Sequence, residues 1–184
     1  LEHERPQLAA RSSPAPESSD RPRIEPPPLA RPSRLVEFKD FGDNPGHLRM
    51  RAHVPPTTAG HPLVVLLHGC GQDAATFAAD SGWIERADRQ RFPLILPDQA
   101  SHSHAGRCFQ WFHRSDTARD AGEAGSIAAM TRTAIARFGI DPRQVFVVGL
   151  SAGAAMAAAL LAAYPDLFAA GASVAGLPVG AARS

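Results

Sequence analysis

The chain has 184 residues and a mass of 19.5 kDa, which is room for one domain or for one domain with an appendage. Its 44% hydrophobic content excludes a collagen-like or wholly disordered protein. The net charge is +1, and 18 scattered arginines accompany a single lysine, so neither nucleic acid nor an anionic membrane is expected as a partner. No stretch approaches the ~18 consecutive apolar residues of a membrane span.

The first part of the chain is rich in proline. Eight of the 17 prolines lie in residues 1–33, where apolar side chains are few and follow no period. Such a segment cannot bury enough apolar surface to offset the entropy lost on ordering. We therefore expect a disordered linker over 1–33 and a folded domain over 34–184. The segment also lacks the apolar core of a signal peptide, and its start at Leu1 suggests that an upstream part is missing.

Alternating and continuous apolar runs predict the elements of the first half. Period-two alternation indicates two antiparallel strands, and the unbroken run Leu63–Leu67 indicates a strand covered on both faces. Asp73 is suited to cap one helix that continues to residues 89–91. In chain order the prediction is strands at 35–38, 48–54 and 63–67, a helix at 74–91, a strand at 92–96 and a polar loop over 97–117.

The second half alternates helix and strand. The prediction is a helix at 123–138 ended by Gly139, a strand at 145–148, an alanine-rich helix from Ser151 to Tyr164, and a strand at 169–174. Strands that alternate with helices indicate a mostly parallel sheet with helices on both faces, which is an α/β fold.

One motif carries the chemistry. Gly149-Leu150-Ser151-Ala152-Gly153 has the form G-x-S-x-G, and it stands where a buried strand ends and a helix begins. That context is the one a nucleophile elbow requires, because the serine sits on a tight turn and the flanking glycines avoid clashes with the neighbouring elements. Ser151 is therefore the candidate nucleophile. The alternative is an ordinary glycine-rich turn.

A second loop agrees with this interpretation. The strand at 63–67 continues into His68-Gly69-Cys70-Gly71-Gln72, and in this topology the corresponding loop supplies a backbone donor to the oxyanion hole. The backbone N–H groups of Ala152 and Cys70 are the candidate donors, with Gly71 as the substitute for Cys70. A plain glycine turn is again the alternative, and His68 has no second ligand at metal-binding spacing.

Four segments resemble the poly(3-hydroxybutyrate) depolymerase family of esterases, α/β-hydrolases that include feruloyl and acetylxylan esterases. They are LVVLLHGCGQ (63–72), GRCFQWF (106–112), GIDPRQVFVVGLSAG (139–153) and YPDLF (164–168), and the resemblance spans roughly 47–182. It implies hydrolysis of carboxylic esters through a serine nucleophile, without a cofactor, often by secreted proteins. The sequence departs from the family pattern at Phe109-Gln110, where Trp-Asn is commoner.

Further candidate residues lie around these motifs. Cys70 and Cys108 both follow strand ends at one edge of the sheet, so a disulfide between them is expected, with two free thiols as the alternative. Trp111 and Gln72 are candidate substrate-binding residues, although Trp111 is equally suited to core packing. The histidines at 102, 104 and 113 are expected to be solvated rather than metal ligands.

A serine hydrolase also needs a base and a carboxylate, which in this fold follow the serine in the order acid, then histidine. All eight histidines precede Ser151, and Asp166 is the one acid after it. We therefore expect an α/β-hydrolase fragment whose last strands, catalytic acid and base lie beyond residue 184. This fragment is expected to be inactive by itself.

The rival hypotheses for the function are a serine peptidase of the same fold and a catalytically dead binding module. The expected partner is an ester substrate, a polyester or an acylated polysaccharide, and the expected location is extracellular, with the cytoplasm as the alternative.

Overall fold

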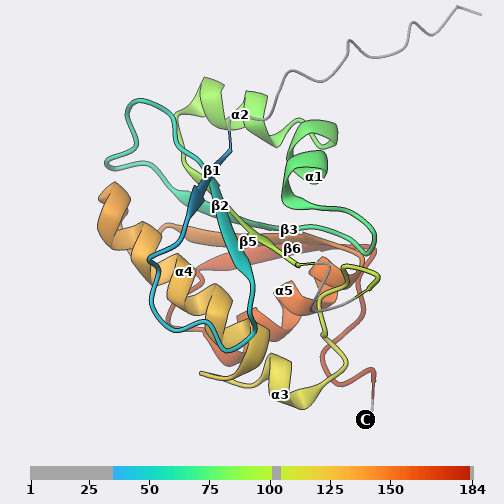
Figure 1. Ribbon diagram of the computed structural model, residues 1–184. Coiled ribbons are helices and arrows are strands. Elements are labelled where there is room, and N and C mark those ends of the chain that lie inside the picture. Colours follow the sequence, from blue (N-terminus) through green and yellow to red (C-terminus); the bar gives the residue numbers. More distant parts are fainter. Residues whose placement is uncertain (1–34, 101–104, 183–184) are drawn as a thin grey trace, which may run out of the picture.

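The computed structural model describes residues 35–100 and 105–182, so the expected linker over 1–33 lies outside the described residues. Figure 1 shows the elements in chain order. The strands are β1 (Val36–Phe38), β2 (Arg49–His53), β3 (Leu63–Leu67), β4 (Leu94–Asp98), β5 (Val145–Leu150) and β6 (Ala170–Val174). The helices are α1 (Ala74–Asp80), α2 (Trp83–Gln90), α3 (Arg114–Thr117), α4 (Gly122–Phe138) and α5 (Ala152–Ala163).

All the described strands belong to one sheet with the order β1-β2-β4-β3-β5-β6. The strands β4, β3, β5 and β6 are parallel, while β1 and β2 pair antiparallel at one edge. The register brings Leu67 of β3 beside Gly149 of β5. The carboxyl ends of these two neighbouring strands therefore meet at the same edge of the sheet, and the predicted α/β architecture is confirmed.

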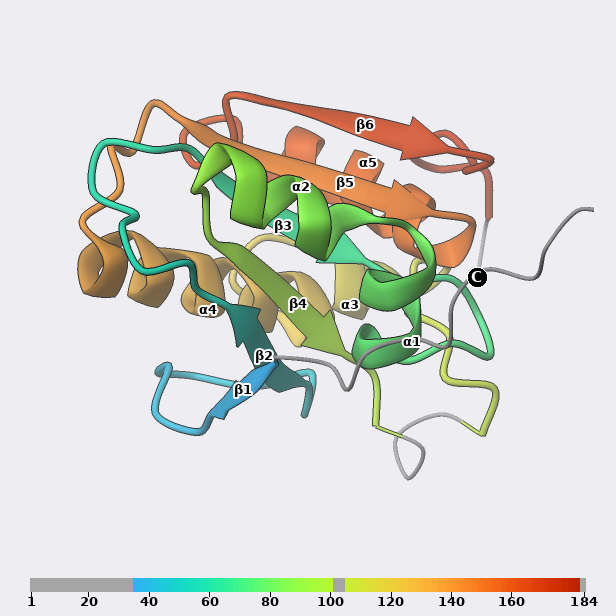
Figure 2. The ribbon, with the colours of Figure 1, turned by 90° about the horizontal axis from the view of Figure 1, so that it is seen from above.

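Helices cover both faces of the sheet, with α1 and α2 on one side and α4 and α5 on the other (Figures 1 and 2). Alternate residues of the central strands enter the two layers. Val65 and Leu67 of β3 pack toward α4 and α5, while Val64 and Leu66 pack toward α1 and α2. This division explains why β3 is an unbroken apolar run, since every one of its residues is buried.

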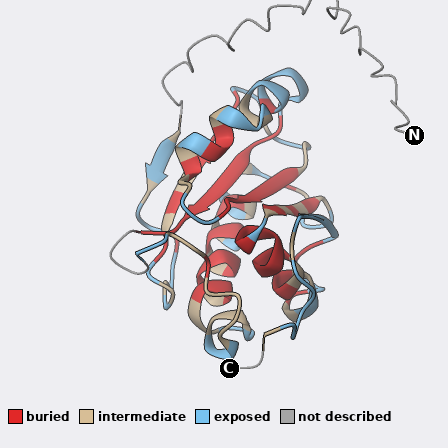
Figure 3. Cartoon of the chain, turned by 90° about the vertical axis from the view of Figure 1, so that its right-hand side faces the viewer, coloured by how far each residue is buried: buried red, intermediate tan, exposed pale blue. Residues whose placement is uncertain are grey.

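The cover ends at one side of the sheet. All residues of β6 are exposed, and Phe146, Val148 and Leu150 of β5 are only half buried on the α1/α2 side. Figure 3 shows the contrast with the buried central strands. No described helix is long and apolar enough to serve as a membrane span.

Three local predictions were wrong. The helix expected over 74–91 is two helices, because Gly82 takes a left-handed conformation with φ 70° between them. The fourth strand begins two residues later than expected and runs on through Pro97 to Asp98. The short helix α3 lies inside the segment that was expected to be a loop.

The other boundaries agree within one or two residues. Asp73 caps α1 by accepting a hydrogen bond of 2.8 Å from the Thr76 backbone N–H. Gly139 ends α4 with a left-handed φ of 67°.

Candidate active site

Ser151 stands on a sharp turn between β5 and α5. Its backbone has φ 54° and ψ −115°, a combination that non-glycine residues rarely adopt, and its residue surface is exposed. The Ser151 backbone N–H donates a hydrogen bond of 2.9 Å to the Val174 carbonyl at the end of β6. This contact helps to hold the strained turn, because it ties the residue to the neighbouring strand.

The two glycines of the motif permit close backbone approaches. A Cβ atom on Gly153 would collide with the Leu67 and His68 carbonyl oxygens, so the first turn of α5 packs directly on the end of β3. A Cβ atom on Gly149 would collide with the Gly153 carbonyl. Any other residue at these positions would push the helix away from the sheet.

The loop that follows β3 lies against the serine. A Cβ atom built on Gly69 would be 3.7 Å from the Ser151 Cβ atom and 3.6 Å from the Leu150 carbonyl. The fold therefore brings the two predicted motifs together, although they are far apart in the sequence. We refer to residues 68–72 below as the Cys70 loop.

Backbone donors surround this junction. Ala152 is the first residue of α5, so its N–H has no acceptor within the helix and lies at the positive end of the helix dipole. The Cys70 N–H makes no hydrogen bond to the described residues, whereas the Gly71 N–H donates to the Gly106 carbonyl at 2.8 Å. Of these two loop N–H groups, only that of Cys70 is thus without a hydrogen-bond acceptor among the described residues.

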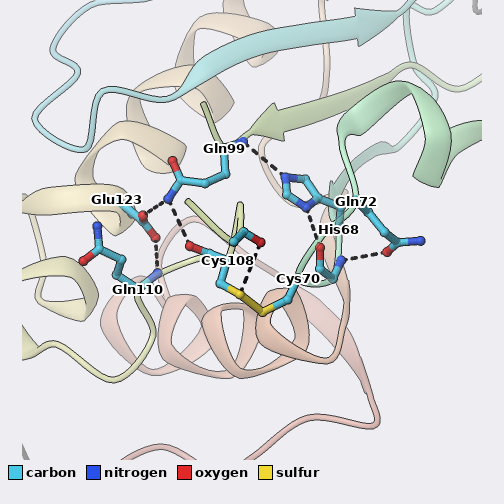
Figure 4. Close-up of a disulfide and its surroundings, with 9 residues drawn as sticks. His68, Cys70, Gln72, Gln99, Cys108, Gln110 and Glu123 are labelled. Atoms are coloured by element: carbon cyan, nitrogen blue, oxygen red, sulfur yellow. Dashed lines mark hydrogen bonds between the residues drawn. A yellow bond between two sulfur atoms is a disulfide. The ribbon is translucent and has the colours of Figure 1, made fainter. Parts of the chain in front are cut away.

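Cys70 and Cys108 form a disulfide, with their Cα atoms 4.3 Å apart. It joins the Cys70 loop to the segment that precedes α3 (Figure 4). The Gln72 side chain braces the same loop from within, because its Oε1 accepts a hydrogen bond of 3.0 Å from the Gly69 N–H. Gln72 therefore shapes the loop in this structure, and a contact with substrate remains a prediction.

His68 is fully engaged and buried. Its Nδ1 donates to the Gly69 carbonyl at 2.9 Å, and its Nε2 accepts a hydrogen bond of 3.1 Å from the Gln99 N–H. Burial lowers the pKa of the imidazole. Both ring nitrogens are occupied in the neutral form, so His68 supports the loop and has no lone pair to take a proton from Ser151.

The one acid after Ser151 is also engaged. Asp166 accepts two hydrogen bonds from the Arg119 guanidinium, at 2.7 and 2.8 Å, and these lower the pKa of its carboxyl to about 2. The arginine also lies over the Tyr164 ring, 4.8 Å from its centroid. This arrangement links the end of α5 to the segment before α4, because the Asp166 carboxylate is held in an ion pair with Arg119.

Trp111 divides its surface between the core and a cavity. One side packs against the core cluster beneath the sheet, and the other lines a cavity of about 480 Å³ between α3 and the segment that follows β6. The cavity also receives Phe112, Arg114 and Val179. Trp111 therefore contributes both to core packing and to the wall of this cavity. Within the described residues no group of three His, Cys, Asp or Glu side chains is placed to hold a metal ion.

The sequence predictions did not include a buried polar cluster behind the disulfide. Glu123, in the first turn of α4, accepts a hydrogen bond from the Gln99 side chain and one of 2.7 Å from the Gln110 N–H. The Gln99 amide also donates to the Cys108 carbonyl at 3.2 Å. Burial raises the pKa of the Glu123 carboxyl to about 7. A glutamate in a first helical turn is usually solvated, so the sequence held no signal for this role.

The chain is similar in sequence to a family of known proteins. A family model described as esterase PHB depolymerase matches residues 48–184. The chain belongs to this family. It is 45% identical over 151 residues to poly(3-hydroxyalkanoate) depolymerase C of Paucimonas lemoignei, which covers 82% of the chain and 36% of that protein. It is also 34% identical over 154 residues to a probable acetylxylan esterase A of Aspergillus flavus, with 83% of the chain and 49% of that protein covered.

Solved structures give the same result for the fold. An acetyl xylan esterase from Aspergillus awamori has a TM-score of 0.74 at 32% identity, over 79% of this chain and 53% of that one. A poly(3-hydroxybutyrate) depolymerase from Bordetella parapertussis has a TM-score of 0.57 at 20% identity, over 73% of this chain and 49% of that one, which shows a shared fold alone. The chain therefore spans about half or less of the length of these relatives.

Proposed function

We propose that this esterase-family chain supplies the nucleophile and the oxyanion hole of a serine carboxylic-ester hydrolase. The observation that carries the proposal is the strained, exposed Ser151 beside two backbone donors, the N–H groups of Ala152 and Cys70. The sequence similarity to a polyhydroxyalkanoate depolymerase and to acetylxylan and feruloyl esterases supports ester substrates.

The reaction follows from this geometry. The Ser151 hydroxyl loses its proton to a base and attacks the ester carbonyl carbon, and the negative oxygen that develops accepts hydrogen bonds from the two N–H groups. Collapse of this intermediate releases the alcohol and leaves an acyl group on Ser151. Water then attacks the acyl carbon, and the acid is released. No cofactor takes part in these steps.

The base and its orienting carboxylate are proposed to lie beyond residue 184. Among the described residues none hydrogen-bonds the Ser151 hydroxyl, and neither His68 nor Asp166 is free for the task. In α/β-hydrolases the acid and histidine follow the serine in the chain, and the relatives are much longer than this chain. On this proposal residues 1–184 alone are an incomplete catalytic unit.

A polyester or an acylated polysaccharide is the proposed substrate class. The cavity beside Trp111 has aromatic and aliphatic walls together with the Arg114 side chain, which suits an acyl chain with polar groups at intervals. The disulfide supports an oxidising, extracellular location, because such bonds persist outside the reducing cytosol.

The test is hydrolysis of p-nitrophenyl butyrate by the natural polypeptide that contains these residues. Ser151→Ala is expected to lower kcat by at least about 10³-fold, as removal of a serine nucleophile does elsewhere. Ser81→Ala, at the junction of α1 and α2, is the matched control and should keep full activity. Residues 1–184 alone should show no serine-dependent turnover.

Four outcomes would contradict the proposal. Undiminished hydrolysis by Ser151→Ala would remove the nucleophile assignment, and serine-dependent turnover by residues 1–184 alone would remove the assignment of base and acid beyond residue 184. Preference for a p-nitroanilide amide over the matching ester would favour the peptidase. No turnover by the longer polypeptide, with normal folding, would favour a binding module.

A further inference from the structure

A chain of hydrogen bonds connects the start of α4 to the disulfide beside the candidate oxyanion hole. Glu123 and Gln99 are both almost completely buried, at 1% and 0% exposure. Gln99 follows β4, and its side-chain amide lies between the Glu123 carboxylate and the Cys108 carbonyl (Figure 4). Since Cys108 is bonded to Cys70, the position of Gln99 bears directly on the Cys70 loop.

Gln99 reaches the same loop by a second route. Its backbone N–H donates to His68 Nε2 at 3.1 Å, and His68 Nδ1 donates to the Gly69 carbonyl at 2.9 Å. One residue therefore contacts the Cys70 loop through its backbone and, by way of Cys108, through its side chain. Both routes end beside the Cys70 N–H, the donor assigned to the oxyanion hole.

We propose that Glu123 is a positioning residue, whose carboxylate orients the Gln99 amide so that the amide holds Cys108, and through the disulfide the Cys70 loop, in place. The proposal adds a residue to the site and, in its effect on catalysis, rests on the proposed function. The hydrogen-bond donors around the Glu123 carboxylate support this role. Both Glu123 oxygens accept hydrogen bonds, from the Gln99 amide and from the Gln110 N–H, which fits an ionised carboxylate.

Protonation of Glu123 disturbs this arrangement. A carboxyl proton would face N–H donors, and the favourable response is a turn of the Gln99 amide that presents its oxygen to Glu123. The Gln99 amide nitrogen would then leave the Cys108 carbonyl, so the link to the disulfide would be lost. The Gln99 Oε1 atom is buried and has no hydrogen-bond partner in the described structure. The ionised state thus leaves Gln99 half satisfied, and a turn of the amide costs no bond at that oxygen.

The charged groups around Glu123 set the pH at which this happens. Asp116 of α3 accepts a hydrogen bond from the Glu123 backbone N–H at 3.3 Å, and its charge adds to burial in raising the Glu123 pKa to about 7.

The other groups near Glu123 add little net charge. At the end of β4, the negative charge of Asp98 is balanced by hydrogen bonds from the Arg49 and Arg51 guanidinium groups. His68 is buried with a lowered pKa. The turn before β2 faces Glu123 with the backbone of Gly46, which carries no charge. The link is therefore complete above about pH 7 and lost below it.

The test follows the disulfide itself, so it does not depend on catalysis. Residues 1–184 hold two cysteines, so peptide mapping of the natural polypeptide, after partial reduction by a phosphine and alkylation, reports the Cys70–Cys108 bond by its mass shift. Glu123→Gln is compared with Glu85→Gln, the same change at an exposed position on α2. At each pH the measured quantity is the ratio of the two reduction rates, which cancels the pH dependence of the reagent.

Above pH 7 we expect Glu123→Gln to be reduced about tenfold faster than the control, the factor given by loss of one charge-assisted hydrogen bond. Below about pH 6 the ratio of the two reduction rates should approach one. Glu123 of the control is then protonated, so both proteins have a neutral side chain at position 123. A ratio of one at every pH would overturn the proposal. A high ratio that does not change with pH would overturn it too, since general destabilisation would produce that result.

Two further measurements separate the possible failures. If Glu123→Gln does not fold, Gln99→Met removes the same link and should give the same pH-dependent ratio against Glu85→Gln. In the ester assay, Glu123→Gln should lower kcat above pH 7 and leave KM unchanged. Absence of any esterase activity in the parent polypeptide would contradict the proposed function, while the disulfide measurement would still decide the role of Glu123.

Discussion

Ser151 has a backbone conformation that favours its chemistry at a cost in stability. With φ 54° and ψ −115°, it presents its side chain at the edge of the sheet, and such a conformation costs a non-glycine residue about 1–3 kcal/mol. Glycine adopts positive φ without this cost. It loses more conformational entropy on folding than alanine does, which costs about 1 kcal/mol. The strain and the exposed hydroxyl are therefore two consequences of one turn.

We predict that Ser151→Gly is more stable than Ser151→Ala, by about 1 kcal/mol in the free energy of unfolding. Both variants lack the hydroxyl, so the comparison isolates the backbone, and both should be equally inactive. Urea denaturation followed by circular dichroism measures the difference. A Ser151→Gly protein that is less stable than Ser151→Ala would show that the turn is not strained.

For single residues, the sequence predicted the backbone conformation better than it predicted buried polar contacts. The motif around Ser151 implies its glycines and its turn, because only one backbone geometry satisfies a strand, an elbow and a helix within five residues. Glu123 and Gln99 belong to no such local pattern. Their partners come from other segments, so their roles depend on the three-dimensional fold.

The elements around the site meet at distances that only small residues allow. Helix α5 begins with alanine and glycine, and a Cβ atom on Gly153 would collide with the carbonyl oxygens at the end of β3. That contact brings the amino end of α5 and the Cys70 loop together. The separation of helix and strand therefore decides whether the two backbone donors can reach one oxygen.

Gly153→Ala should accordingly destabilise the protein by about 3 kcal/mol, because the added methyl group must displace backbone rather than a flexible side chain. Gly60→Ala is the control, since Gly60 has a φ of 79° and no atom within 4 Å of an added Cβ. It should cost only about 1 kcal/mol, from its left-handed conformation. Thermal or urea unfolding of the two variants measures both values. Equal costs would mean that α5 moves away from β3 without resistance.

The predicted boundaries of helices and strands were wrong where the local sequence signals were weak. The break between α1 and α2 depends on the left-handed Gly82, and a glycine inside a helical pattern is often tolerated. Strand β4 runs through Pro97 because it pairs there with β2, where Pro97 lies opposite Met50, while its register with β3 covers only Leu94 and Ile95. The proline lies beyond that pairing, so its missing N–H breaks no bond to β3.

Over the whole molecule, burial is uneven across the sheet. The central strands are covered on both faces, whereas β6 is exposed along its length and pairs on one side only, with β5. Beside it, Phe146, Val148 and Leu150 of β5 are half buried. Continuous apolar strands predicted the covered part of the sheet correctly, because their sequence reflects burial on two faces. The strand Ala170–Val174 has small residues instead, which record little about what lies against them.

An exposed edge strand next to half-buried apolar side chains favours association with another strand. We predict that purified residues 1–184 self-associate through β6, and that Ala172→Lys, in the middle of this strand, shifts the protein toward monomer. A charge at an open edge opposes pairing because it would have to be desolvated.

Light scattering after size-exclusion chromatography measures the mass of the protein at several concentrations. Val54→Lys adds the same charge at an exposed residue outside the strands, so it controls for a general gain in solubility. If both variants raise the monomer fraction equally, or if the parent chain is monomeric throughout, the edge of β6 is not the site of association.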